Sequence, residues 1–151
     1  MKFFIAALLC CLAIAGVSSG ALASTAAQEK QFVDTYRKAY EAKDDKTLVS
    51  LLYTKGADPA ALGFYKMMMA AEAGGKISSI QLVDLNADDM ARIETMKSPA
   101  GQPMKLVLPA AKKLVIKSEM KDKNGSSSSS SEIFVGESDG RLYVLVPAAA
   151  K

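Results

Sequence analysis

The sequence predicts an α+β domain in which N-terminal helices pack on a curved antiparallel sheet. Two observations support this class. Apolar residues recur at helical spacing through residues 25–73, and the second half of the chain alternates apolar and polar residues between Asn-Gly and Asp-Gly turn signals. Segregated helices and strands of this kind place the helices together against one sheet.

The first 23 residues have the pattern of a secretory signal. Lys2 precedes an apolar run from Phe3 to Ala15, and small residues close on Ala21-Leu22-Ala23. A basic start, a short apolar run and an A-x-A site are typical of a cleaved signal peptide. We therefore expect export to the periplasm or extracellular space, one domain over residues 24–151, and no stable membrane anchor after cleavage. A retained N-terminal anchor helix is the alternative.

The composition removes several chemistries from the exported chain. There is no histidine, and both cysteines, Cys10 and Cys11, lie in the expected signal. The exported chain therefore has no imidazole base, thiolate nucleophile or disulfide, and carboxylates are the only usual zinc ligands left to it. We expect no cofactor and no bound metal. The formal charge of +3 does not predict nucleic acid as a partner.

Three helices are expected first. The first runs from about residue 25 to residue 43 and has one apolar stripe: Phe32, Val33, Tyr36, Ala39 and Tyr40. Asp44 or Asp45 caps a short second helix, which Gly56 ends. Asp58-Pro59 supplies a cap followed by a proline in the first turn, so a third helix is expected over residues 59–73.

Strands and one further helix follow. The strands are expected at residues 77–85, 104–108, 112–121 and from Ser126 onward. The helix is expected from Asn86 to about Lys97, with two aspartates in its first turn, where their charge suits the helix dipole. The last strands are expected to form a four-stranded antiparallel meander.

Six consecutive serines, Ser126–Ser131, follow Asn124-Gly125. If Asn124-Gly125 is a two-residue hairpin turn, Ile116 faces Ile133 and apolar side chains meet across the hairpin. The serines are therefore expected to continue the strand. A frayed hairpin tip and a glycosylated or phosphorylated tract are the alternatives.

The second turn signal, Asp139-Gly140, sets Val135 opposite Val144. One sheet face then carries the residues assigned to the core beneath the helices: Leu114, Ile116, Met120, Ile133, Val135, Val144 and Val146. The other face carries a second apolar cluster: Val115, Phe134, Tyr143 and Leu145. Because exposed apolar clusters often mark interaction surfaces, we expect this second cluster to be the interface of a homodimer.

Four residues are candidates for lining a ligand pocket: Tyr36, Tyr40, Tyr65 and Met68. Their spacing on the first and third helices lets them face one cavity, with hydroxyl groups directed inward. The alternative is a core position with the hydroxyl groups reaching solvent at the rim. No catalytic residue is assigned.

Two short motifs imitate metal sites. Met67-Met68-Met69 offers three thioethers, but successive helical side chains diverge by about 100°, so core filling is expected instead. Asp84-x-Asn86-x-Asp88 imitates a calcium loop, but Asp89 stands where the turn requires glycine and Thr95 where a bidentate glutamate belongs. Neither motif is expected to bind a metal.

Three stretches carry a family resemblance: Phe32-x-x-x-Tyr36-x-x-Ala39-Tyr40-x-x-Lys43-Asp44, Leu48-x-x-Leu51-Leu52-Tyr53, and Phe134-Val135 with Gly140 to Pro147. With the order of elements, they resemble the nuclear transport factor 2-like superfamily, a cystatin-like cone that includes the SnoaL-like domains. Its members include isomerases, dehydratases, hydrolases and non-catalytic binders, so the fold does not assign a function. Catalytic members place Asp, His or Tyr in the cone, whereas this chain has no histidine and no aspartate in residues 104–121 or 132–135.

The composition therefore favours an exported, non-catalytic domain that binds a small apolar ligand or acts as a dimeric interaction module. The alternative is a lyase, isomerase or hydrolase that uses a carboxylate and a tyrosine inside the cone.

Overall fold

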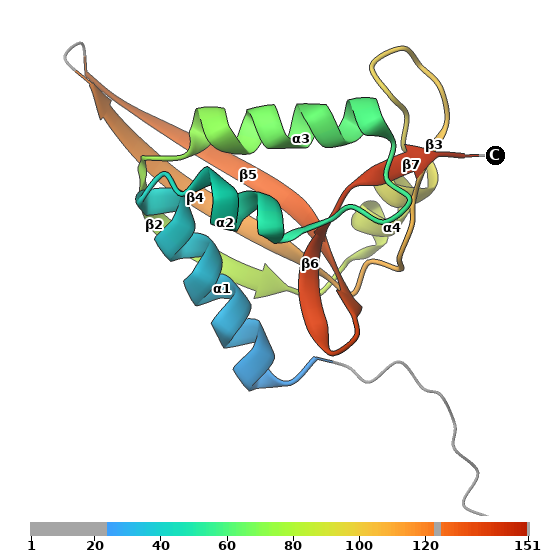
Figure 1. The fold of residues 1–151 in the computed structure, drawn as a ribbon, viewed down its shortest axis with the longest axis horizontal. Helices are drawn as coiled ribbons and strands as arrows, with labels where there is room; N and C mark the ends of the chain where they lie inside the picture. The colour runs from blue at the N-terminus through green and yellow to red at the C-terminus, as the bar shows by residue number, and fades with distance from the viewer. Residues whose placement is uncertain (1–23, 123–124, 151) are drawn as a thin grey trace, which may run out of the picture.

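The computed structural model of the protein describes residues 24–122 and 125–150. Its elements in chain order are α1 (Ala26–Glu41), α2 (Asp45–Ser50), β1 (Leu52–Tyr53), α3 (Pro59–Glu72), β2 (Lys76–Val83), α4 (Ala87–Glu94), β3 (Met104–Leu106), β4 (Lys112–Asp122), β5 (Gly125–Ser138), β6 (Arg141–Leu145) and β7 (Pro147–Ala149). The fold is α+β with helices packed on a sheet, as predicted (Figure 1). No helix among the described residues is long and apolar enough to cross a membrane.

Local sequence signals set the helix starts. Thr25 accepts a hydrogen bond from the N–H of Gln28 and begins α1 in a capping box. Asp58 caps α3 and precedes the proline that opens the helix. Asn86 and Asp89 form a second reciprocal pair at the start of α4. The stretch that imitates a calcium loop is therefore a strand end followed by a capped helix, as expected.

The main sheet has the order β1-β6-β5-β4-β2, in which β1 is parallel to β6 and the other neighbours are antiparallel. The predicted meander was wrong at its first strand. β3 leaves the main sheet and pairs with β7, while β2 takes the place beside β4. Neither β1 nor β7 was expected as a separate strand, since each has only two or three residues.

One predicted hairpin register is confirmed and the other was wrong by two residues. Val135 faces Val144, and Asp139 and Gly140 both adopt positive φ, at 52° and 71°, as a two-residue turn requires. In the β4–β5 hairpin, Ile116 faces Ser131 rather than Ile133. A shift by two residues keeps every side chain on its predicted face. Asp122 pairs with Gly125, so the connection falls on residues 123–124, which lie outside the described part.

The core lies between the sheet and helices α1 to α3. Six of the seven assigned sheet residues are buried there: Leu114, Ile116, Ile133, Val135, Val144 and Val146. Met120 was assigned wrongly, because it is 42% exposed. It lies on the hairpin arm of β4 and β5, which extends past the helices (Figure 1). The serines belong to β5 as expected, and Ser126–Ser130 are exposed on this arm.

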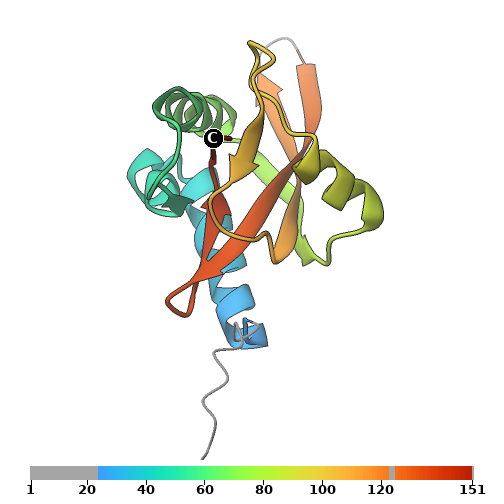
Figure 2. The same cartoon turned by 90° about the vertical axis from the view of Figure 1, so that its right-hand side faces the viewer.

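The second sheet face is covered by the protein itself, and the expectation of an open apolar face there was wrong. Phe134 is 9% exposed and Leu145 only 1%. Val115 and Tyr143 are half-buried. The chain between β2 and β4 folds back across this face, so that α3 and α4 lie on opposite sides of the sheet (Figure 2). The guanidinium of Arg92 on α4 lies 5.5 Å from the centroid of the Phe134 ring.

Candidate functional site: a cleft where the sheet divides

The candidate site arises where the chain turns from one sheet to the other. β6 pairs with β5 only between Val135 and Ser138, and β7 then pairs with β3 in the small sheet. In the described part of the chain, no strand therefore lies beside β5 before Val135 on the side away from β4. The resulting gap between β5 and β7 is the split-sheet cleft.

The split-sheet cleft has a volume of about 680 Å³. Its apolar lining comes from α3, the segment after α4, β3, β5 and β7: Ala60, Ala61, Phe64, Tyr65, Met96, Pro99, Met104, Phe134 and Pro147. Its charged lining comprises Asp58, Arg92, Lys97 and Glu132. The apolar walls and the balance of two acidic and two basic side chains suit a mainly apolar ligand without large net charge.

A charged network of Asp89, Arg92, Lys113 and Glu132 supports one wall of the cleft. The Lys113 Nζ lies 2.9 Å from Asp89 Oδ1 and 3.3 Å from Glu132 Oε2. The Arg92 guanidinium lies 2.8 Å from Glu132 Oε2 and 3.5 Å from Asp89 Oδ1. Since Asp89 is only 1% exposed, this network fastens α4 to β4 and β5 rather than forming a solvated surface pair.

The network holds Asp89, Lys113 and Glu132 in their charged forms. The hydrogen bond from Lys113, followed by that from the Asn86 N–H, lowers the pKa of Asp89. The Arg92 hydrogen bond lowers the pKa of Glu132, and the bond to Asp89 raises the pKa of Lys113. Carboxylates held in this way are poor proton acceptors near neutral pH. The network therefore shapes the cleft and is unsuited to general-base chemistry.

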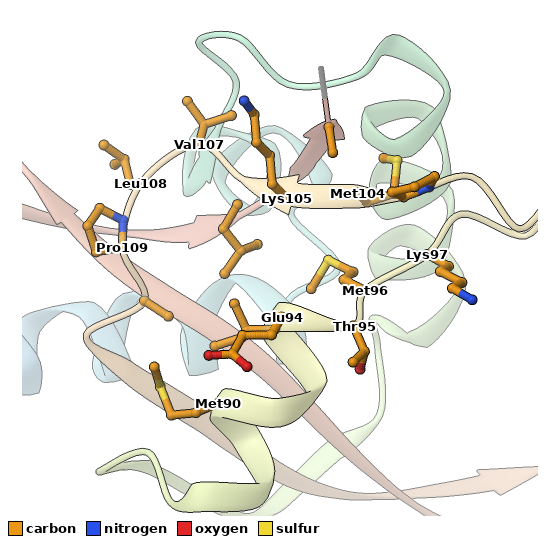
Figure 3. A pocket seen from close by; sticks show the side chains of 15 residues that line it. Met90, Glu94, Thr95, Met96, Lys97, Met104, Lys105, Val107, Leu108 and Pro109 are labelled. Carbon is orange, nitrogen blue, oxygen red and sulfur yellow. The ribbon is translucent and has the colours of Figure 1, made fainter.

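A second hollow of about 690 Å³ adjoins the cleft on the other side of residues 95–97. Figure 3 shows the side chain of Met96 between α4 and β3, with Met90 farther out on α4. Met90 and Val107 are both exposed in this hollow. We take the split-sheet cleft as the site, because it reaches the buried ring of Phe134 and is supported by the charged network.

The structure brings only one predicted pocket residue, Tyr65, to the cleft. Tyr36 and Tyr40 are buried in the core, and Met68 is half-buried without lining the cleft. Tyr40 donates a hydrogen bond of 3.0 Å to the Ser118 hydroxyl, which lies 2.9 Å from that of Ser129. Burial, and then the charge of Glu72, raises the pKa of Tyr36.

Sequence reasoning missed most of the cleft. Phe134 was expected at a dimer interface and instead lines the cleft, while Phe64, Met96 and Arg92 were not singled out. Phe64 gave no local signal, because most of α3 is apolar and only the structure shows this ring to be 52% exposed. Arg92 gave no local signal either, because Glu132 and Phe134, which it contacts at the cleft, come from β5.

Comparison with known proteins does not identify a family. No family model matches the chain, and no curated protein sequence does either. Among solved structures, the helical cell shape determining protein Pgp2 from Campylobacter jejuni is similar with a TM-score of 0.40 and 12% identity. The match covers 77% of this chain and 38% of that one. At this level of similarity, the match supports neither a shared family nor a shared function.

Proposed function

We propose that the protein is a non-catalytic binding domain that holds a small, mainly apolar ligand in the split-sheet cleft. The observation that carries the proposal is a mostly apolar cleft of about 680 Å³ whose walls come from α3, β3, β5, β7 and the segment after α4. Ligand sites are typically concave, mostly apolar and about 300–1,000 Å³ in volume. Phe134, Met104 and Pro147 are themselves buried, so the shape of the cleft is maintained without a ligand.

The charges around the cleft favour a neutral or zwitterionic ligand with an apolar body. Arg92 is bound to Glu132, and the Asp58 carboxylate accepts from the N–H groups of Ala60 and Ala61. Arg92, Glu132 and Asp58 are therefore committed to contacts within the protein. A ligand held mainly by the walls gains about 25 cal/mol for each Å² of apolar surface that it removes from water.

The rival function, catalysis by a carboxylate and a tyrosine, lacks the contact that would support it. It needs a carboxylate hydrogen-bonded to Tyr36, Tyr40 or Tyr65. In residues 24–122 and 125–150, Tyr40 donates to Ser118, and no carboxylate is bonded to any of the three hydroxyl groups. The expected secretory signal, and the non-catalytic binders of the superfamily that the sequence resembles, also support a binding role in an exported compartment.

A titration with the uncharged apolar fluorophore N-phenyl-1-naphthylamine tests the proposal. Ala61→Phe fills the cleft and Phe64→Ser removes part of its wall, so each should weaken binding by about tenfold, the equivalent of about 1.4 kcal/mol. Met67→Ser is the control, since Met67 is 64% exposed on the same helix and does not line the cleft. Unchanged affinity in folded Ala61→Phe protein would reject the cleft as the site.

A further inference from the structure

The hairpin arm presents an open sheet edge. β5 pairs with β4 from Gly125 to Val135 but with β6 only from Val135 onward. Gly125–Ser130 are all exposed. Because strand residues direct their backbone N–H and C=O groups alternately to the two sides, part of this backbone faces solvent. We call the side of residues 125–131 that faces away from β4 the serine edge.

The other described sheet edges are protected in ways that the serine edge is not. β1 has two residues, and β3 and β7 have three each, so they offer little backbone for pairing. β2 has an irregular register between Ile77 and Ser79. Short strands, bulges, prolines and charges are the usual means of blocking edge-to-edge association. Ser126–Ser131 contain no charge and no proline, and their pairing with β4 is regular.

The serine edge is complementary to itself. In an antiparallel pair about a two-fold axis, the same surface patch meets its copy. A uniform serine tract places serine opposite serine in several neighbouring registers, without like charges facing each other, and the hydroxyl groups form cross-strand hydrogen bonds. A foreign strand would instead need pockets for alternate side chains to be selected. Small, identical side chains do not provide such pockets, so a second copy is the better occupant.

Helix α3 approaches β5 beside this edge through Glu72 at its C-terminal end. The Ser131 hydroxyl donates to Glu72 Oε2 at 3.3 Å. A two-fold axis beside the serine edge places the α3 helices of both copies on the same side of the joined sheet. The pairing itself depends on the strand backbone and the serine hydroxyl groups.

We propose that the protein forms a symmetric dimer by antiparallel pairing of two serine edges. A strand pair of this length is smaller than the standard interface of about 800 Å² per partner. The dimer is therefore concentration-dependent rather than obligate. It leaves the split-sheet cleft, at the other end of α3, separate from the contact.

Sedimentation velocity of the purified protein between about 1 and 200 µM tests the proposal, because a dimer with a Kd in this range changes its weight-average mass across the series. The weight-average mass should rise toward that of a dimer. Ser128→Lys places like charges across the axis and should raise the dimer Kd by at least about tenfold. Ser78→Lys, an exposed serine on β2, is the matched control and should leave the Kd unchanged.

A second variant separates the dimer from the cleft. Phe64→Ser should weaken ligand binding in the cleft and leave the dimer Kd unchanged. Thermal unfolding of each variant confirms that the monomer is folded. A monomer throughout the concentration range overturns the proposal, as does a dimer whose Kd is unaffected by Ser128→Lys.

Discussion

Replacing Gly136 by alanine is expected to destabilise the fold at the point where the chain between β2 and β4 lies across β5. A Cβ atom at this position would lie 2.9 Å from the carbonyl oxygen of Pro109 and 2.9 Å from Leu145 Cδ2. The Leu145 side chain is buried, and Pro109 is held by its neighbour Ala111, whose N–H donates to the Val135 carbonyl at 2.8 Å. Neither group can retreat without disturbing the cover of the second sheet face.

The expected change in the free energy of unfolding combines two opposing effects. Overpacking a well-packed site costs about 1–3 kcal/mol. Alanine also restricts the unfolded chain, which stabilises the protein by about 0.4–1 kcal/mol. The net expectation is a loss of about 1–2 kcal/mol in the free energy of unfolding, measured by urea denaturation followed by circular dichroism, with an unchanged slope.

Gly63→Ala is the matched control and has the opposite expected sign. Gly63 lies in α3, and a Cβ atom added there would meet nothing within 4 Å. Alanine at this position should stabilise the protein by up to about 1 kcal/mol through helix propensity. If Gly136→Ala proved as stable as the wild type, the segment around Pro109 could not lie against β5, and the account of the covered face would be refuted.

Two further predictions concern polar contacts between elements. The lowered pKa values of Asp89 and Glu132 mean that their contribution to stability is complete above the unfolded carboxyl values and is lost as the pH falls from about 5 toward 3. The thermal midpoint should fall less steeply with decreasing pH in Asp89→Asn than in the wild type. Asp45→Asn, at an exposed position in the first turn of α2, should show the same fall as the wild type. An equal fall in all three proteins would contradict the network. Tyr40→Phe removes the hydrogen bond to Ser118 and should lower the free energy of unfolding by about 0.5–1.5 kcal/mol in urea denaturation. Tyr143→Phe, at a half-buried ring on the other sheet face, should change it by less, and the reverse order would count against the Tyr40 contact.

The features that the sequence predicted correctly depend on near neighbours in the chain. The caps Thr25, Asp58 and Asn86 act on N–H groups two or three residues away, so their effect is visible in a short window. The Asp139-Gly140 turn likewise follows from the two residues that tolerate positive φ. The order of helices and strands was therefore largely predictable.

The β4–β5 register shows where such reasoning stops. Two neighbouring registers both keep apolar residues on the core face, so side-chain alternation does not separate them. The Asn124-Gly125 signal favoured one register, but Gly125 pairs with Asp122 and belongs to the strand. The choice depends on how the whole hairpin packs against β2 and the helices.

The sequence by itself determined which residue types are available for chemistry, the α+β class, the helix caps, and which residues of β4 and β5 share a sheet face. Each of these features follows from residue type or short-range spacing. Only the tertiary structure decided that β3 pairs with β7, that Lys113 reaches Asp89 across 24 positions, and that Phe134 lines a cleft rather than an open face. These outcomes depend on which distant surfaces can pack together at the lowest free energy. The resemblance to the nuclear transport factor 2-like superfamily stays a prediction, since core and turn residues carry it and many folds share them.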